Sequence, residues 1–240
     1  MAARPRYLLI LTCLLLAALT TTGCEATGNV LSRTKTVRVG DAQKVETSIE
    51  MGAGRLVVES GARSLMEGQF ETSYSHWEPE IAYKVDGSLG ELSIVQPPMK
   101  GGMRTENIVN QWNIRLNDEV PMALSIALGA GQSEIDLTGM TLTDLDISVG
   151  AAEITLDLRG NWDQNLDVRM AGGVGKVLIR LPSRVGVRAE VRGGIGTIES
   201  TGLINKGTKW YNAAYGESDV TLDVDVEGGI GEIRLEVDEY

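Results

Sequence analysis

The chain has 240 residues, of which 42% are hydrophobic and 5% aromatic, and its formal net charge is −11. This length allows one sizeable hydrophobic core. The acidic balance argues against nucleic acid and against electrostatic adhesion to anionic lipid, because both need a basic surface. We therefore expect no nucleic-acid partner.

The N-terminus has the pattern of a secretory signal peptide, which we assign to residues 1–23. Arg4 and Arg6 precede an apolar run from Tyr7 to Leu19. These 13 residues are too few for a membrane-spanning helix, which needs about 20, but they fit the apolar core of a signal peptide. Removal of the two arginines would change the net charge from −11 to −13. The protein is therefore expected outside the cytoplasm.

Cys24 is the candidate lipidation site. The stretch Thr20–Cys24 resembles the lipobox of bacterial lipoproteins, in which the cysteine is lipidated and becomes the first mature residue. Gly23 fits that pattern, whereas Thr21 occupies a position where an aliphatic residue is usual. A mature chain with a single cysteine has no internal disulfide partner, which a lipid would explain. The alternative is ordinary cleavage after Gly23 and secretion; either way, residues 24–36 are expected to form a polar tether.

Residues 37–118 are interpreted as an irregular β region. Short strands are expected around Leu56–Val58, Phe70–Thr72, Ile81–Tyr83 and Leu92–Ile94. Turn-forming residues such as Asp86-Gly87 separate them. Residues 99–110 show no clear period and are expected to form an exposed loop.

Residues 119–240 form the regular part, in which apolar residues recur about every 21 residues. The repeated columns are Leu124, Leu145, Leu166 and Val187; Ile126, Ile147, Val168 and Ala189; and Leu128, Val149, Met170 and Val191. Within each copy, apolar and polar residues alternate, which predicts strands with one buried face. A copy this short cannot bury its own apolar face, so copies are expected to stack into a solenoid.

Glycine-rich corners divide each copy, as in Gly129–Gly131 and Gly172–Gly175. A fifth copy, Leu222–Leu235, is offset by 35 residues from the fourth because residues 201–218 form an insertion. An earlier, less regular copy lies at Val45–Ser60. The irregular N-terminal strands and residues 236–240 are expected to cap the ends of the solenoid.

The sequence resembles the toastrack family of bacterial envelope proteins, a group of adhesin-like domains of unknown function. The similarity rests on Trp112–Asn117, Val120–Leu124, Leu142–Val149, Asn212–Gly216 and Leu222–Gly231. It implies an all-β fold, a single-stranded right-handed β-helix with turns of about 21 residues. Some relatives act in the cell-envelope stress response beside a membrane histidine kinase. The resemblance brings no catalytic residues to this chain.

The residues give little indication of metal or cofactor chemistry. Gly172–Gly175 and its echoes resemble a calcium-binding repeat, but Val177, Ile198 and Ile233 stand where carboxylates would be needed. Asp146, Asp167 and Asp223 are expected to share one outward column with Ser125 and Arg188, which is typical of a solvated surface. The only histidine is His76, so the common zinc sites are excluded. No cofactor, metal or catalytic residue is therefore assigned.

Trp210, Tyr211 and Tyr215 are the candidate partner-binding residues, because aromatic side chains in loops often mark contact surfaces. Alternatively, these rings plug the end of the core. We predict a non-enzymatic lipoprotein that acts as a surface binding or scaffold module, adhesin-like or accessory to envelope-stress signalling. Its partners would be the membrane, through Cys24, and an envelope protein or glycan. The alternative is a β-helix lyase or hydrolase that acts on envelope polysaccharide.

Overall fold

The computed structural model describes residues 30–98 and 108–237, where the only helix is a short 3-10 turn at Ser75–Trp77. The strands are β1 (Leu31–Val37), β2 (Lys44–Glu59), β3 (Met66–Thr72), β4 (Glu80–Asp86), β5 (Leu89–Val95), β6 (Asn110–Leu116), β7 (Met122–Asp136), β8 (Leu142–Asp157), β9 (Leu166–Leu181), β10 (Gly186–Thr201), β11 (Ile204–Lys206), β12 (Lys209–Tyr211) and β13 (Thr221–Val237). No helix in these ranges is long and apolar enough to cross a membrane. The proposed signal peptide, Cys24 and residues 99–107 lie outside the described ranges.

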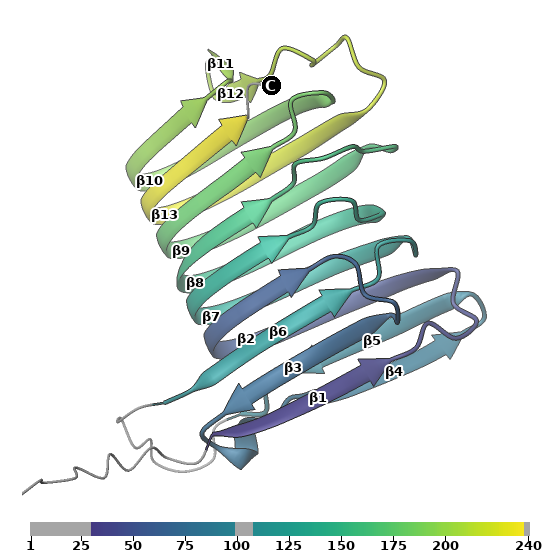
Figure 1. The fold of residues 1–240 in the computed structure, drawn as a ribbon. Coiled ribbons are helices and arrows are strands. Elements are labelled where there is room, and N and C mark those ends of the chain that lie inside the picture. Colours follow the sequence, from purple (N-terminus) through teal and green to yellow (C-terminus); the bar gives the residue numbers. More distant parts are fainter. Residues whose placement is uncertain (1–29, 99–107, 238–240) are drawn as a thin grey trace, which may run out of the picture.

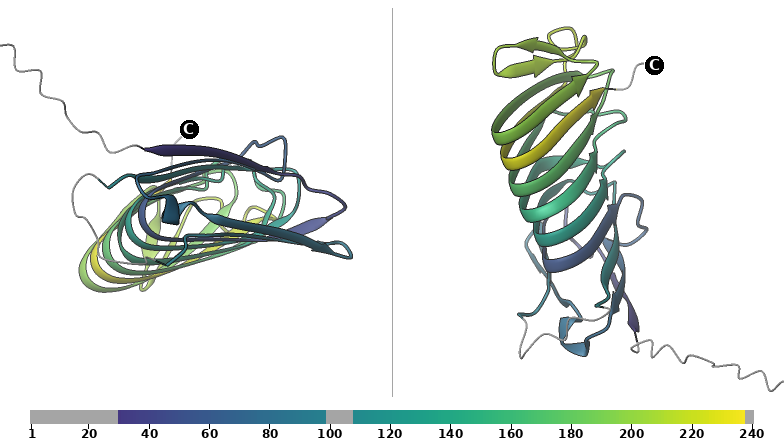
Figure 2. Two further views of the ribbon diagram at one scale, coloured as in Figure 1. Left: turned by 90° about the horizontal axis from the view of Figure 1, so that it is seen from below. Right: turned by 90° about the vertical axis from the view of Figure 1, so that its left-hand side faces the viewer.

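Six long strands bend sharply at their glycine corners and stack in parallel, as Figure 1 shows. From one end of the stack to the other they are β2, β7, β8, β9, β13 and β10. Seen along the stack, the coils superpose as flattened loops (Figure 2). The predicted all-β solenoid is confirmed. We call the end that carries β1, β3, β4 and β5 the proximal end, and the end that carries β10, β11 and β12 the distal end.

The core lies inside the coils, where period-two alternation places one face of every strand. In β7, for example, Leu124, Ile126 and Leu128 are buried, and the residues between them are not. At the proximal end the buried Trp112 ring packs edge-on against Phe70, with 5.6 Å between ring centroids. This T-shaped arrangement is favourable for aromatic pairs and closes the core there.

The coils do not stack in chain order. β13, the fifth copy, lies between β9 and β10 and pairs in parallel with both. Val237 lies beside Leu181 inside the stack, so the expectation that residues 236–240 cap the solenoid is wrong for the two that are described. Residues 202–220 connect the end of β10 to the start of β13. β13 is therefore hydrogen-bonded to a neighbouring strand along both of its edges.

The step between coils is not constant. Gln132 bonds to Glu153, 21 residues on, whereas Asp146 bonds to Arg169, 23 residues on. A slip of two residues keeps every side chain on its predicted face, so the apolar pattern alone could not reveal it. As a result, Asp146 and Asp167 do not share a column: Asp146 lies beside Arg169, and Asp167 lies between Asp144 and Asp223.

The N-terminal region contains the expected strands and one that was not expected. The predicted segments within 56–94 all lie in strands, and β4 and β5 form a hairpin that turns at Gly87. Residues 31–36, assigned to the tether, belong instead to β1, which pairs antiparallel with β3. Arg33 and Lys35 on this exposed strand approach Glu78; charged side chains of this kind are typical of sheet edges.

Two glycine columns hold the bends together. The first comprises Gly52, Gly129, Gly150, Gly173, Gly229 and Gly194. A Cβ on each of the last five would lie 2.0–2.4 Å from a glycine carbonyl oxygen of the neighbouring coil. The second column contains Gly131 and Gly175, whose φ angles of 135° and 147° disfavour other residues. Close backbone stacking therefore requires glycine in every coil of the first column, whereas the second column holds Ala152 in β8.

Candidate binding surface at the distal end

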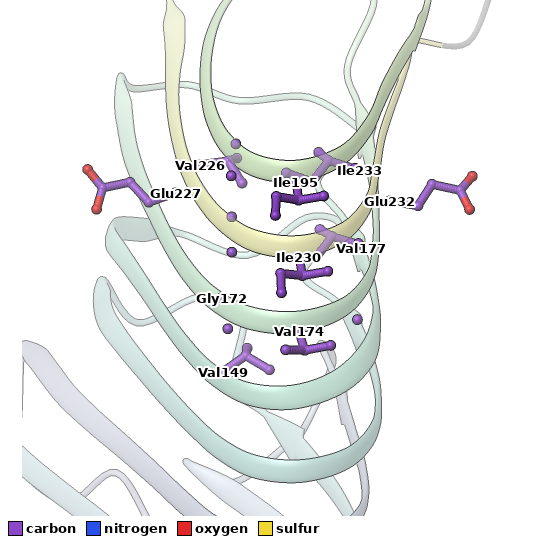
Figure 3. Close-up of a pocket in the computed structure, with 18 of the residues that line it drawn as sticks. Val149, Gly172, Val174, Val177, Ile195, Val226, Glu227, Ile230, Glu232 and Ile233 are labelled. Atoms are coloured by element: carbon purple, nitrogen blue, oxygen red, sulfur yellow. The ribbon is translucent and has the colours of Figure 1, made fainter.

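The inward side chains at the bend become smaller from the proximal to the distal coil. The inward position before the bend is occupied, from the proximal to the distal coil, by Met51, Leu128, Val149, Gly172, Gly228 and Gly193. Loss of the side chain in the last three coils leaves an apolar cavity of about 90 Å³. Val226, Val177 and Ile233 line it (Figure 3).

The apex of the bend changes in the opposite direction, and its residues in the last three coils also line the cavity. The apex residues, in the same order, are Ala53, Ala130, Ala151, Val174, Ile230 and Ile195. The last three lie above one another at the bend in Figure 3 and are 53%, 54% and 74% exposed. We call these three residues the aliphatic ridge. Exposed aliphatic side chains that adjoin one another, unlike scattered ones, suggest a contact surface.

The last coil has a free edge. β12 pairs only with residues 188–190 of β10. Beyond Glu190, no described strand pairs with the outer edge of β10. Residues 192–201 are exposed throughout, including Ile198 at 40%. The free edge, the aliphatic ridge and the hairpin β11–β12 together form what we call the distal face.

Asn212 fastens the hairpin to the last coil. Its Nδ2 donates to the carbonyl oxygens of Pro182 at 3.1 Å and Val185 at 2.7 Å. Its Oδ1 accepts from the Val187 N–H at 2.9 Å, and its own N–H donates to the Val187 carbonyl at 3.3 Å. The side chain is 4% exposed, so these backbone groups depend on Asn212 for their hydrogen bonds.

The three candidate aromatic residues lie in or just after the hairpin β11–β12, which we call the distal cap together with the residues up to Tyr215. They have different roles. Trp210 sits beside Ala189 and packs partly buried against the core. Tyr211 and Tyr215 form a tilted pair with ring centroids 4.7 Å apart, and the Lys206 ammonium lies 5.4 Å from the Tyr211 centroid. Tyr215 is 39% exposed. The tyrosines therefore offer a ring surface to solvent, whereas much of Trp210 is structural.

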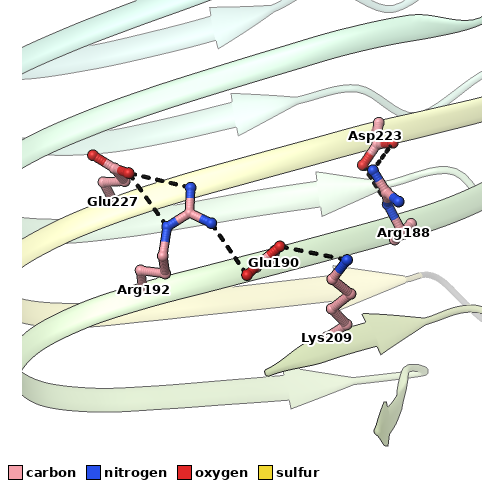
Figure 4. A network of polar contacts seen from close by, with 6 residues as sticks. All are labelled: Arg188, Glu190, Arg192, Lys209, Asp223 and Glu227. Carbon is pink, nitrogen blue, oxygen red and sulfur yellow. Dashed lines mark hydrogen bonds and ion pairs between the residues drawn. The ribbon is translucent and has the colours of Figure 1, made fainter. Parts of the chain in front are cut away.

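Ion pairs cross from coil to coil on the outer surface (Figure 4). Arg188 pairs with Asp223. Arg192 contacts Glu227 of β13 at 3.1 Å and Glu190 of its own strand at 3.1 Å, and Glu190 also approaches Lys209 of the hairpin. On the other arm of the coil, Glu199 pairs with Arg234 at 3.0 Å. Opposite charges on neighbouring strands are favourable and help to set the register.

Asp157 is a buried carboxylate with a structural role. Burial alone would raise the pKa of Asp157. Hydrogen bonds from Arg159, with Nε at 2.9 Å and its backbone N–H at 3.1 Å, outweigh burial, and the charges of Arg159 and Arg180 add to them. The pKa is therefore lowered, and the ionised carboxylate holds the turn after β8.

We expect Asp157→Asn to destabilise the fold at pH 7 by about 1–2 kcal/mol, because hydrogen bonds to a charged group are lost. A lowered folded pKa means that this contribution is present above the ordinary value of about 3.9 and disappears as the pH falls through the folded pKa. The melting temperatures of wild type and Asp157→Asn should therefore differ at neutral pH and become equal as the pH is lowered. The exposed Asp136, one coil away in the same column, is the matched control: Asp136→Asn should change little. A difference in melting temperature between wild type and Asp157→Asn that is the same at neutral and acid pH would contradict the assigned role of the carboxylate.

The described residues show no constellation typical of an active site. They contain no group of three or more His, Cys, Asp or Glu residues placed to hold a metal ion. On the outer surface around Glu134 and Glu232, each of these carboxylates pairs with an arginine, Arg55 and Arg234 respectively, at 2.8 Å. These acids contribute to a solvated surface of mixed charge.

Sequence reasoning missed the aliphatic ridge and the free edge. The ridge had a signal: the corner residue is alanine in Gly129–Gly131 but valine or isoleucine in the last three coils. The free edge had none, because nothing in the pattern indicates that the fourth copy, rather than the fifth, ends the stack.

Comparison with known proteins identifies relatives of the whole fold. Residues 26–180 match the family model described as the N-terminal domain of toast_rack, DUF2154. A crystal structure of a "putative cell adhesion protein" from Clostridium sporogenes ATCC 15579 is 32% identical, with a TM-score of 0.85. The match covers 88% of this chain and 100% of that chain.

Two further crystal structures of a "putative adhesin" come from Bacteroides fragilis NCTC 9343 and Parabacteroides distasonis ATCC 8503. They are 11% and 10% identical, with TM-scores of 0.30 and 0.29, and the matches cover 86% and 88% of this chain and 97% and 98% of those chains. Likenesses this low support no functional argument. No curated protein matches the sequence.

Proposed function

Because this chain belongs to the toast_rack family, we propose that it is a non-enzymatic binding module at the bacterial cell surface. The observation that carries the proposal is the full-length likeness to the Clostridium sporogenes protein, whose description names cell adhesion. The fold supports the proposal, because a stiff stack of coils presents an exposed apolar distal face. The scarcity of convergent carboxylates in the described ranges favours binding over hydrolysis.

The two ends of the stack would then have different tasks. β1, the first described strand, lies at the proximal end, and Leu31 follows Cys24 by only seven residues. A lipid on Cys24 would hold the proximal end at the membrane. The distal face would stand about 40 Å away, given a strand spacing near 4.8 Å. This arrangement directs the aliphatic ridge and the tyrosine pair toward partners beyond the membrane surface.

The anchor can be tested by cell fractionation. We expect Cys24→Ala to move the protein from the membrane fraction to the medium or soluble envelope fraction, because the lipid attachment site is lost. Cys13→Ala is the matched control, since Cys13 lies within the apolar run of the proposed signal peptide. Equal partitioning of both variants with wild type would contradict lipidation at Cys24.

The partner is to be found by crosslinking tagged chain in intact cells and purifying what remains attached. A binding module should retain an envelope protein or glycan reproducibly. Recovery of one membrane signalling protein would make the module a signalling accessory. Degraded envelope polysaccharide in place of a retained partner would favour the enzyme alternative and overturn the proposal.

The tyrosine pair is the proposed contact within the cap. We expect the double change Tyr211→Ala and Tyr215→Ala to weaken partner binding about tenfold or more, because exposed rings at an interface each contribute on the order of 1–3 kcal/mol. Changing both residues to Phe keeps the rings and should keep most of the affinity. If the Ala double variant binds as wild type does, the rings only close the cap.

A further inference from the structure

The free edge of β10 lacks the usual protection of an edge strand. Natural proteins cover, charge or interrupt such edges to prevent pairing with other chains. Here the residues around the bend, 193–198, are Gly-Gly-Ile-Gly-Thr-Ile, without charge or proline. Ile195 is the most exposed large hydrophobic residue of the described ranges, at 74%. The edge therefore favours pairing with another strand.

We propose that this edge pairs with the same edge of a second copy about a two-fold axis through the bend, so that two stacks point in opposite directions and meet at their distal ends. With the anchor of the proposed function, the two copies would stand on facing membranes. The axis would exchange the two arms of β10 and run them antiparallel. Placed between Ile195 and Gly196, it sets Arg192 opposite Glu199 and Gly193 opposite Ile198 of the other copy. Two-fold self-pairing of this kind is the commonest form of homo-oligomer.

The charges of the two arms are complementary in this register. Arg192 and Glu199 point outward on different arms, and each is already paired across the neighbouring coil, with Glu227 and Arg234 respectively. A second copy would add a carboxylate beside Arg192 and a guanidinium beside Glu199. The alternation of sign that Figure 4 shows between β13 and β10 around Arg192 would thus continue across the joint.

The inward residues of the free edge are apolar. Gly193 contributes no side chain, and Ile198 of the same copy, 40% exposed, lies with its Cδ1 3.6 Å from where a Gly193 Cβ would be. In the paired register, Ile198 of each copy also packs against the Gly193 backbone of the other. The join would bury both isoleucines and close the two cavities against each other.

The hairpin β11–β12 shows that the outer edge of β10 accepts an antiparallel strand, and it determines which residues of that edge remain unpaired. β12 runs antiparallel to β10 over Arg188–Glu190, as an arm of the second copy would. It ends where the free edge begins, so residues 191–200 remain open. A straight foreign peptide could pair with only one arm of this bent edge, whereas β10 of a second copy bends at the same place. A second copy is therefore the occupant that fits.

The register predicts which residues meet, so crosslinking between two variants tests it. Full-length chains carrying Cys13→Ala and Cys24→Ala, to remove both native thiols, would also carry Arg192→Cys or Glu199→Cys. A short thiol-reactive crosslinker should join the two chains when they are mixed and neither variant with itself. Asp146→Cys replaces Glu199→Cys as the control, because the Asp146 side chain is half exposed. It should give no dimer with Arg192→Cys.

Light scattering on the unmodified edge is the second measurement, since a cysteine variant could lose affinity. The Cys24→Ala chain should show a dimer mass that depends on concentration. Arg192→Glu or Glu199→Arg alone should raise the dimer dissociation constant tenfold or more, and the two changes together should restore it. A monomer at all concentrations, or a dimer that crosslinks equally through Asp146→Cys, would overturn the proposal.

Discussion

Gly173→Ala should destabilise the fold by on the order of 3 kcal/mol, although it adds a single methyl group. The new Cβ would lie 2.4 Å from the Gly150 carbonyl oxygen. This atom belongs to the backbone of the neighbouring coil and cannot move aside as a flexible side chain could. Forcing atoms into such a site costs about 1–3 kcal/mol or more. For a chain of this size, the melting temperature should fall by roughly 10 °C.

The adjacent Gly172 is the matched control, on the same strand and with the same substitution. Its Cβ would find only the Glu227 carbonyl oxygen, 4.0 Å away, and would point toward the apolar cavity. Gly172→Ala should therefore be neutral or stabilise by about 0.4–1 kcal/mol, because alanine reduces the entropy of the unfolded chain. Equal losses in calorimetric melts of the two variants would contradict the stacking argument.

Asn212→Ala should cost about 2–4 kcal/mol and release the hairpin from the last coil. The change leaves the Val187 N–H and the Val185 and Pro182 carbonyls without their partner. Each buried unpaired group costs about 1–3 kcal/mol. Hydrogen exchange at Val187 should rise, and limited proteolysis should cut the segment after β10 more rapidly.

Asn113→Ala is the control for that change. Asn113 lies exposed on β6 at the proximal end, so its substitution should leave both the melting temperature and the proteolysis pattern near wild type. Unchanged protection at Val187 in Asn212→Ala would mean that the hairpin is held by Trp210 and the β12 pairing instead.

The alternation of residues such as Leu145, Ile147 and Val149 was enough to predict the strands and the solenoid, because period two has only one structural meaning here. It could not determine the register of β8 and β9. Leu145 pairs with Val168 instead of Leu166, and this shift of two residues leaves each side chain on its predicted face. It could not determine the order of coils either. The apolar columns of β10 and β13 are equivalent, and only the loop between them decides which ends the stack.

The candidate site was predicted only in part. The break in period at residues 201–218 correctly marked a departure from the regular coils, and the structure places Trp210, Tyr211 and Tyr215 there on the distal cap. Whether they bind a partner stays a prediction. The aliphatic ridge depends on Val174 and Ile230 being neighbours in space, 56 residues apart in the chain. Such proximity follows from the insertion of β13, which no local pattern encodes.

The most direct measurement of the central claim is retention of envelope material by the immobilised chain, with the released products analysed in the same experiment. A binding module predicts saturable retention of an envelope protein or glycan, weakened by the Tyr211→Ala, Tyr215→Ala double variant, and no new reducing ends. Release of shortened polysaccharide without stable retention would contradict the account and identify the protein as an enzyme.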